Sequence, residues 1–322
     1  MLVFLEHHGD QLLRGPLGVL SKAAALDGDV AGVVVGTGVR ALAEEAGRHG
    51  ASRVYVADDT PLQAPLPQPR VDVLAQIVRD GGVDAVLFGN SVLAADVAAG
   101  LAARLDAGLN WDLVDIARDG GRLVGIRAAL QDSVYVEVGW TSEPQLALFR
   151  SGAFDPVEPG GFAEVVDVPV SLEAFSTEAQ MLEQAHEEAE GPSIEEADIV
   201  VSGGRGLGGP ENFVLVEGLA KALGGAVGAT RAVVDAGWYP YSAQVGQTGK
   251  TVSPRLYVAC GISGAIQHKV GMQSAGVIVA INKDPNAPIF EFADLGVVGD
   301  VHQVVPKLTE LIEQRKQSGD GG

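Results

Sequence analysis

The sequence contains a single cysteine, Cys260, among its 322 residues. One thiol cannot form a disulfide within the chain, which favours a reducing cytoplasm as its location. No stretch approaches the roughly 18 uninterrupted apolar residues typical of a transmembrane helix. The first residues, MLVFLEHHGDQ, lack the basic start and cleavage site of a signal peptide and the arginine-rich character of a transit sequence. We therefore expect a cytoplasmic protein that does not insert into a membrane.

Basic residues are also scarce. Lys and Arg total 22 against 42 Asp and Glu, which gives a net charge of −20, and only seven of the basic residues are lysine. A chain of this charge repels phosphate backbones, which argues against nucleic acid as a partner. The shortage of lysine fits either adaptation to a high-salt cytoplasm or an ordinary acidic protein, and both interpretations stay open.

Apolar residues are abundant, at 47%, and the length suggests two domains. In the first half, apolar runs typical of buried strands alternate with segments whose apolar residues recur every three or four positions. This alternation predicts a nucleotide-hydrolase-like α/β domain, in which helices cover both faces of a parallel sheet. Strands are expected at 2–8, 30–36, 53–59 and 84–91, and helices at 16–26, 38–50, 70–82 and 93–105.

The pattern changes after residue 110. Successive apolar segments with short turns and no helix between them predict an antiparallel extension of the sheet, at 122–130, 133–140 and 144–150. The acidic segment 176–198 then predicts a surface helix or linker. We place the domain boundary there, with residues 1–190 in the N-terminal domain and residues 191–322 in a second, Rossmann-like α/β domain.

The second domain begins with a strand and a glycine-rich loop, GGRGLGG. Its spacing, Gly204-x-Gly206-x-x-Gly209, between a strand and an expected helix at 211–225, is that of a dinucleotide-binding loop. The acidic residue expected about 20 positions later is missing, because Glu217 comes too early and Asp235 too late. A plain glycine turn is therefore the alternative.

Three further segments carry polar groups near expected strand ends. QVGQTGK, residues 244–250, fails the phosphate-loop spacing, but its amides and hydroxyl suit the polar edge of an aromatic ring. GATRAVVDAGW predicts Thr230 and Arg231 at the start of a strand, with Arg231 as a plain surface charge in the alternative. No metal is expected, since the histidines and cysteine lack ligand spacing, and Cys260 is expected to pack as a small hydrophobe.

GISGAIQH predicts a helix that begins at Ser263 and Gly264 and carries Gln267 and His268 one turn later. Residues four apart share a helical face, so Gly264 would leave room beside the imidazole of His268 for a flat ring. A purely structural His268 is the alternative.

Residues 198–312, with GISGAIQHKVGM followed by VAINKDPNAPIF, resemble the electron transfer flavoprotein α subunit almost without interruption. The first 190 residues fit the family more loosely, best at GLNWDLVDI. The resemblance implies that the C-terminal domain holds FAD and that a β subunit completes a heterodimer. Thr230 stands where many members have serine, which keeps the hydroxyl. The implied flavin-contacting positions are Arg205, Thr230, Arg231, Gln244, Val245, Gly246, Gln247, Thr248, Ser263, Gly264, Ala265, Ile266, Gln267, His268, Asn282, Asp300 and Val301.

The resemblance also implies a role for several of these side chains. His268, as imidazole or imidazolium, would oppose the negative charge that reduction puts near the C2 carbonyl of the flavin. Thr248 is similar to the residue at flavin N5, and Arg231 to a guanidinium near the ring. Arg205 and the 203–209 loop would serve the adenosine and pyrophosphate end.

The implied function is electron carriage rather than conversion of a substrate. Electrons would come from flavoprotein dehydrogenases, such as those acting on acyl-CoA in fatty acid β-oxidation, and pass to a membrane quinone oxidoreductase. One alternative is a bifurcating form that oxidises NADH through a second FAD in the partner; GQTGK looks more like the simple carrier. Two others are an NAD-dependent dehydrogenase using the 203–209 loop and a nucleotide-binding regulatory module without redox work.

Overall fold

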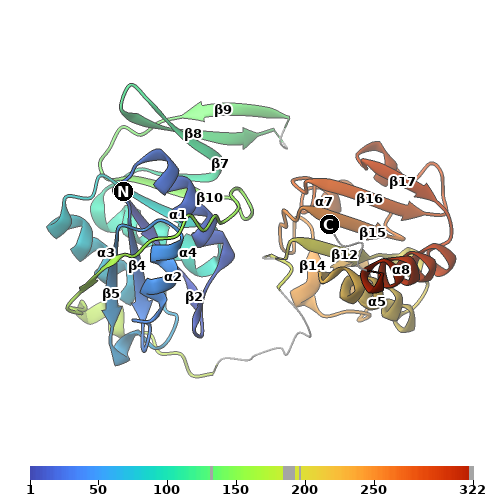
Figure 1. Cartoon of the computed structure of the whole chain (residues 1–322), viewed down its shortest axis with the longest axis horizontal. Helices are drawn as coiled ribbons and strands as arrows, with labels where there is room; N and C mark the ends of the chain where they lie inside the picture. Colours follow the sequence, from blue (N-terminus) through green and yellow to red (C-terminus); the bar gives the residue numbers. More distant parts are fainter. Residues whose placement is uncertain (131–132, 184–192, 196, 319–322) are drawn as a thin grey trace. The chain divides into compact units, whose positions relative to one another are not determined.

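The computed structural model describes residues 1–322 except 131–132, 184–192, 196 and 319–322 (Figure 1). It divides the chain into two compact units, Met1–His186 and Glu187–Gly322, each with its own sheet and core. The predicted boundary between residues 190 and 191 lies outside the described residues, as do residues 184–192 and 196 of the predicted linker. The two-domain α/β class expected from the sequence is confirmed.

The first unit is built on a nine-stranded sheet in the order β11-β5-β4-β1-β6-β10-β7-β8-β9. All neighbours from β11 to β7 pair in parallel, while β7, β8 and β9 pair antiparallel and form the extension at one end (Figure 1). The strands are β1 (Leu2–Phe4), β4 (Ala31–Gly36), β5 (Arg53–Asp58), β6 (Ala85–Gly89), β7 (Leu109–Asp119), β8 (Arg122–Ala129), β9 (Val134–Val138), β10 (Gln145–Phe149) and β11 (Glu164–Asp167).

One strand prediction for this sheet is wrong. Residues 144–150 do not join the antiparallel extension, because β10 lies between β6 and β7 and runs parallel to both. Its residues Leu146 to Phe149 are all buried, and a strand that is apolar on both faces needs a central position in the sheet. The first strand of the extension is instead β7, which the sequence analysis did not predict.

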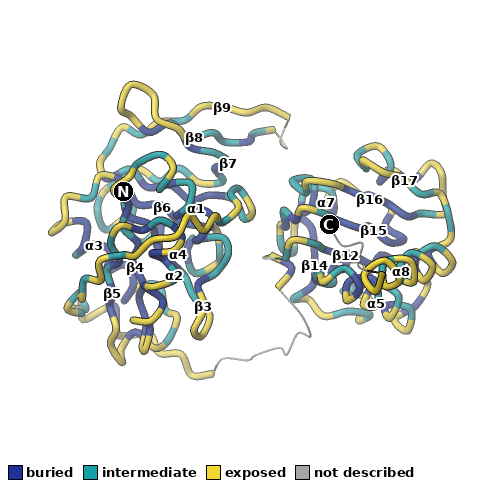
Figure 2. The backbone as a smooth tube through the Cα atoms, in the orientation of Figure 1, coloured by how far each residue is buried: buried dark blue, intermediate teal, exposed yellow. Residues whose placement is uncertain are grey.

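Helices cover both faces of this sheet. α1 (Arg14–Leu26) and α2 (Leu42–Arg48) pack into one core cluster, and α3 (Pro67–Gly81) and α4 (Val92–Leu105) into the other. Figure 2 shows the buried strands enclosed between them. Ser91 begins α4 as its N-cap, with its hydroxyl accepting from the Ala94 amide at 2.9 Å.

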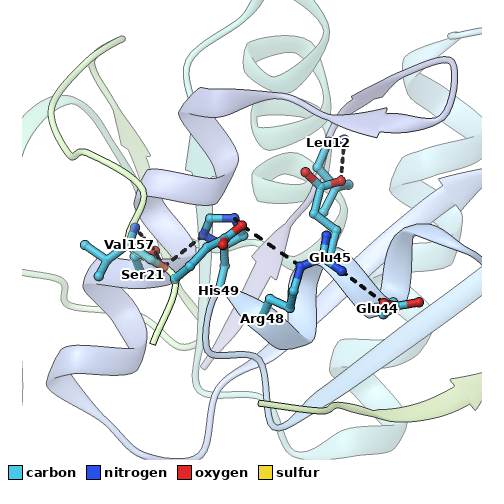
Figure 3. A network of polar contacts seen from close by, with 8 residues as sticks. Leu12, Ser21, Glu44, Glu45, Arg48, His49 and Val157 are labelled. Carbon is cyan, nitrogen blue, oxygen red and sulfur yellow. Dashed lines mark hydrogen bonds and ion pairs between the residues drawn. The ribbon is translucent and has the colours of Figure 1, made fainter. Parts of the chain in front are cut away.

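A polar network ties the segment before β11 to α1 and α2 (Figure 3). The Ser21 hydroxyl donates to the Val157 carbonyl at 3.1 Å and accepts from the Val157 amide at 3.0 Å. The Nδ1 of His49, a buried residue, donates to the same carbonyl at 2.9 Å. Glu45 accepts the Leu12 amide at 3.0 Å. The chain is thus held against the helices before it returns to the sheet.

Arg70 of α3 is hydrogen-bonded to the segment that precedes this helix. Its side chain is only 4% exposed, and its guanidinium donates to the carbonyls of Ala64 at 2.8 Å and Leu66 at 3.0 Å. Burial lowers the pKa of Arg70 to about 10, against the opposing charge of Glu6, so it stays charged at neutral pH. Buried carbonyls next to a charged donor make this a stabilising contact.

The second unit has a six-stranded, fully parallel sheet in the order β14-β13-β12-β15-β16-β17. α5 (Phe213–Leu223) and α8 (Val301–Gln317) cover one face, and the loops around Met272 and Ile289 cover the other. β14 and β17 were not predicted. The strands are β12 (Ile199–Gly203), β13 (Ala226–Thr230), β14 (Gln244–Val245), β15 (Leu256–Cys260), β16 (Val277–Asn282) and β17 (Leu295–Val298).

Thr230 and Arg231 do not start a strand, contrary to the prediction. Thr230 ends β13, and Arg231 begins the short helix α6 (Arg231–Val234). The Val-Val pair that suggested a strand lies within this turn, which the Asp235 amide closes by donating to the Arg231 carbonyl at 2.8 Å. Throughout the described ranges, no helix combines the length and apolar character needed to cross a bilayer.

Candidate cofactor-binding site

The expected flavin-contacting residues gather at the C-terminal edge of the second sheet. They follow the ends of β12, β13, β15, β16 and β17 or lie in the loop that contains β14. β12 has β13 on one side and β15 on the other, so the chain builds the sheet outward first in one direction and then in the other. Open parallel sheets bind ligands at the C-terminal edge where this reversal occurs. Here that position is between β12 and β15.

The glycine loop after β12 is packed against the loop after β15. The Gly204 amide donates to the Cys260 carbonyl at 3.0 Å, and the Gly206 amide to the Gly261 carbonyl at 2.9 Å. Two 3₁₀ turns, Arg205–Leu207 and Pro210–Asn212, follow before α5 begins, so the loop does not lead directly into a helix as expected. This departs from the dinucleotide-binding pattern, in which a helix N-terminus faces the pyrophosphate.

Two arginines stand exposed along this edge. The guanidinium of Arg205 makes no hydrogen bond or ion pair within the described part of the chain. Arg231 pairs with Asp235 at 3.2 Å, with both side chains more than half exposed. An exposed pair of this kind contributes at most about 1 kcal/mol, so Arg231 can turn to another anion at little cost. Both can therefore receive a phosphate group.

Loop 244–250 forms a compact turn rather than a flexible loop. The Lys250 amide donates to the Gln244 carbonyl at 2.7 Å, and the Gln244 side-chain amide to the Thr248 hydroxyl at 3.2 Å. The exposed Tyr241 donates its hydroxyl to the Thr248 carbonyl at 2.9 Å. Gln244 and Val245 are buried, whereas Gln247 and Thr248 are exposed. The loop thus presents its polar tip to solvent from a fixed base.

The side chain of Lys250 is already paired with a carboxylate. Its ammonium pairs with Glu195 at 2.8 Å, where the chain enters the second unit. This ion pair and the wrong spacing of the loop both argue against a phosphate-binding role for Lys250.

The helix predicted from Ser263 is shorter and begins later. α7 spans Ile266–Lys269, so Gly264 lies outside it and shares no helical face with His268, contrary to the prediction. Gly264 has φ +89°, a region that favours glycine, and a Cβ there would lie 2.4 Å from the Ile289 nitrogen. The glycine therefore makes room for the backbone at Ile289, not for a ring beside His268. Ser263, Ala265, Ile266 and Gln267 are exposed.

His268 is buried and connects α7 to its surroundings on both sides. Its Nδ1 lies 3.0 Å from the Val245 carbonyl, and its Nε2 lies 2.9 Å from the Tyr257 hydroxyl. Burial lowers the pKa of His268 to about 4, although the Val245 carbonyl favours the charged form. The ring is therefore neutral at pH 7, and the imidazolium considered from the sequence is not the form that this environment stabilises.

The remaining expected residues shape the edge. The Asn282 side chain donates to the Ile262 carbonyl at 2.9 Å and accepts the Asp284 amide at 3.0 Å. Asp300 is the N-cap of α8 and accepts the His302 amide at 2.9 Å, and Val301 is buried as the first residue of that helix. These contacts hold the ends of β16 and α8 in place beside the candidate site.

The donors at this edge fit FAD. Exposed guanidinium groups suit a pyrophosphate, and exposed amides and hydroxyls suit the polar edge of an isoalloxazine ring. The structure shows no group of His, Cys, Asp and Glu residues that could hold a metal within its described ranges. Sequence reasoning missed Tyr257, Gly261 and Ile289, which fix the loops from below. Of these residues only Gly261 could be noticed in the sequence, as a glycine directly after an apolar run, and the structure gives it a positive φ. Tyr257 lies within that apolar run and does not stand out.

Comparison with known proteins identifies the same two units. Residues 1–173 match the model of the electron transfer flavoprotein domain, and residues 193–273 match that of the electron transfer flavoprotein FAD-binding domain. The second match supports FAD as the cofactor of this unit.

Relatives align along almost the whole chain. Electron transfer flavoprotein subunit alpha of Mycobacterium tuberculosis (strain ATCC 25618 / H37Rv) is 44% identical over 318 residues, covering 98% of this chain and 99% of the relative. The protein of the same name from Bacillus subtilis (strain 168) is 41% identical, with 89% of each chain covered. Protein FixB of Clostridium saccharobutylicum is 38% identical, with 98% of this chain and 96% of the relative covered. The chain belongs to the family of electron transfer flavoprotein α subunits.

Proposed function

We propose that this chain is the FAD-holding subunit of a heterodimeric electron carrier whose other subunit is an electron transfer flavoprotein β subunit. The observation that carries the proposal is the open character of the candidate site. Residues from five strand ends meet at one edge of the sheet, and the groups that would meet the ring, including Thr248, Ile266 and Gln267, are exposed. A carrier needs such an edge, because electrons pass to other proteins and not to a substrate sealed inside.

We assign roles along this edge by charge and exposure. Arg205 and Arg231 would pair with the pyrophosphate or the ring, since both guanidinium groups are exposed. Residues 244–248 and 263–268 would hold the isoalloxazine from two adjoining segments, because the Gln247 amide donates to the Gln267 carbonyl at 2.7 Å. Thr230, Asn282, Asp300 and Val301 complete the edge.

Two titratable groups near the edge, His268 and Cys260, do not favour substrate chemistry. FAD, when bound, supplies the electron chemistry itself. His268 is neutral at pH 7 and buried, with both ring nitrogens engaged. Burial raises the pKa of the Cys260 thiol to about 12, so it is neither a nucleophile nor an acid near neutral pH. Neither His268 nor Cys260 is suited to act as an acid or base on a substrate near neutral pH, which supports a cofactor site.

We propose that the heterodimer works in the cytoplasm, takes electrons from flavoprotein dehydrogenases of the acyl-CoA type and delivers them to a membrane quinone oxidoreductase. The alternative of an NAD-dependent dehydrogenase is disfavoured by the glycine loop, since Gly206 packs on Gly261 and 3₁₀ turns precede α5. The two acidic residues nearest the position expected for an NAD-binding acid already have partners. Glu217 accepts a hydrogen bond from Tyr239, and Asp235 is paired with Arg231.

The test is to co-express the chain with its β subunit and count FAD in the purified heterodimer. One FAD, reduced anaerobically by acyl-CoA dehydrogenase with its substrate but not by NADH alone, is the expected result. Two FAD with direct reduction by NADH would establish the bifurcating alternative. A colourless heterodimer that takes up no added FAD would contradict both forms of electron carriage.

A further inference from the structure

Two buried polar side chains, Tyr257 and Ser202, lie near His268 in the core of the second unit. Tyr257 of β15 is fully buried, with its hydroxyl 2.9 Å from His268 Nε2. Ser202 of β12 is also fully buried. The register places Val200 opposite Tyr257, so Ser202 lies diagonally across from it on the same face of the sheet. Ser202, Tyr257, His268 and the Val245 carbonyl thus form a polar series inside an apolar cluster.

The hydrogen-bond partners, together with the burial that keeps the ring neutral, decide where the protons of this series lie. The Val245 carbonyl only accepts, so His268 Nδ1, 3.0 Å away, carries a hydrogen. In the neutral ring Nε2 is then a lone pair, and Tyr257 donates its hydroxyl hydrogen to it. We call these two hydrogen bonds the His268 bridge. It links β15 to loop 244–250 and leaves neither ring nitrogen available to another partner.

Ser202 lies near Tyr257 on the same face of the sheet but is not part of the bridge. Burial raises the pKa of the Tyr257 phenol, and the nearby Ser202 hydroxyl acts in the opposite direction. Within the described part of the chain, the buried Ser202 Oγ has no hydrogen-bond partner. Gly228 provides its space, because a Cβ there would lie 2.1 Å from Ser202 Oγ.

We propose that Tyr257 is a positioning residue that holds His268 as an uncharged bridge to Val245, and that this bridge, not a charge on the ring, is what His268 contributes to FAD binding. The inference rests on the proposed function, because an FAD-holding chain is what gives loop 244–250 a cofactor to receive. It replaces the electrostatic role expected for His268 with a mechanical one.

The bridge acts on FAD through the shape of the loop. Two hydrogen-bonded contacts attach loop 244–250 to the α7 region. Val245 is held by the bridge, and the backbone amide of Gln247 donates a hydrogen bond to the Gln267 carbonyl. If the bridge is lost, the loop is held at fewer points and must be ordered when FAD binds. Ordering a loop on binding lowers affinity without removing any contact to the ligand.

Three substitutions separate the bridge from a charge. Tyr257→Phe removes the donor to Nε2, and His268→Ala removes the ring. His268→Gln keeps an uncharged donor for Val245 and an acceptor for Tyr257, but it can never carry a positive charge. Tyr239→Phe is the matched control, since it removes a hydroxyl of the same unit that contacts Glu217 and lies outside the series.

The measurements are the FAD dissociation constant and the reduction potential of the purified heterodimer. We expect Tyr257→Phe and His268→Ala to weaken FAD binding about tenfold, because FAD must then order the loop as it binds. His268→Gln and Tyr239→Phe should stay within about threefold of wild type, with an unchanged potential. A His268→Gln variant as weak as His268→Ala, or lower in potential by about 60 mV, which is tenfold for one electron, overturns the proposal. So does a Tyr257→Phe variant that binds like wild type.

Nitrogen NMR of heterodimer labelled in its histidine rings reads the bridge directly. The signals absent from His268→Gln belong to His268, and at pH 7 they should show a protonated Nδ1 and a bare, hydrogen-bonded Nε2. A doubly protonated ring overturns the proposal. A wild-type heterodimer that binds no FAD would instead contradict the proposed function. The protonation state of the His268 ring would still be measured by these signals, because they do not depend on FAD.

Discussion

Gly206 and Gly261 touch through their backbones across the reversal point of the second sheet. The Gly206 amide donates to the Gly261 carbonyl at 2.9 Å, and a Cβ on Gly206 would lie 2.6 Å from that same oxygen. No flexible side-chain tip is available to give way, because the obstacle is backbone. The contact fixes the two loops between which a ligand of an open parallel sheet binds.

Gly206→Ala should therefore separate the two loops. We expect a destabilisation of the second unit by about 1–3 kcal/mol, the usual cost of overpacking, together with weaker FAD binding. Amide hydrogen exchange of β12 and β15 measures the first effect and flavin fluorescence the second. Gly218→Ala is the control: it lies in α5 with open space around its Cβ position and should stabilise by about 0.5–1 kcal/mol. Equal stability of Gly206→Ala and wild type would contradict the role of the contact.

Arg205→Ala should weaken FAD binding about ten- to hundredfold. A guanidinium that pairs with phosphate contributes roughly 1.5–3 kcal/mol as a charged hydrogen bond. Arg205 is exposed, so its removal should hardly change stability. Arg315→Ala, in the last turn of α8, controls for the loss of one exposed positive charge. Titration calorimetry with FAD decides the matter, and an affinity equal to that of the control would remove Arg205 from the pyrophosphate site.

His268 should make the second unit less stable in mild acid. Its folded pKa of about 4 lies below the ordinary value of 6.5, so the unfolded chain binds the proton more readily between these values. The stabilisation is complete above pH 6.5 and is lost as the pH falls towards 4. At pH 5.5 the loss relative to pH 7.5 is about 1.4 kcal/mol.

A variant that cannot titrate isolates this contribution. His268→Gln should lose about 1.4 kcal/mol less than wild type between pH 7.5 and 5.5, because all other groups titrate alike in both proteins. Hydrogen exchange of the β15 amides, corrected for the pH dependence of exchange itself, gives the two free energies. Parallel losses in the two proteins would mean that the ring is already charged in the folded state.

Arg70→Met should destabilise the first unit by about 2 kcal/mol. The change keeps the aliphatic stem but leaves the carbonyls of Ala64 and Leu66 without their charged donor. Arg79→Met, in the last turn of the same helix and exposed, is the matched control. Pulse proteolysis in urea, with fragments identified by mass, measures the unfolding of this unit. A midpoint shared by the two variants would show that the buried guanidinium adds nothing to stability.

The periodicity of apolar residues was sufficient to predict the alternating strands and helices, but it was not sufficient to predict the order of the strands in the sheet. The run at 144–150 predicts a strand, but its neighbours are decided by burial on both faces, which places β10 between β6 and β7. β7 escaped notice because polar residues interrupt its apolar ones, as in a strand that leaves the core for an extension. Local pattern also misled at Arg231, where a valine pair belongs to a helical turn.

The candidate site shows the same division. The glycine loop, loop 244–250 and the segment around His268 are visible as motifs, because each carries polar groups beside a buried strand. Their mutual contacts are not visible, because Gly206 meets Gly261 and Val245 meets His268 only through pairing across the sheet edge. Tyr257, the partner of His268, lies eleven residues before it in an apolar run and gives no signal of its own.

β12 opens the second unit in sequence, yet both of its neighbours in the sheet, β13 and β15, are made later. The binding edge therefore comes into being only when the last strands have joined the sheet, and a partly synthesised or partly unfolded chain offers FAD nothing to bind. Every tenfold excess of FAD over its dissociation constant then adds about 1.4 kcal/mol to the folded state. A cell short of flavin should lose this protein to its proteases instead of storing it empty, so its abundance should follow vitamin supply.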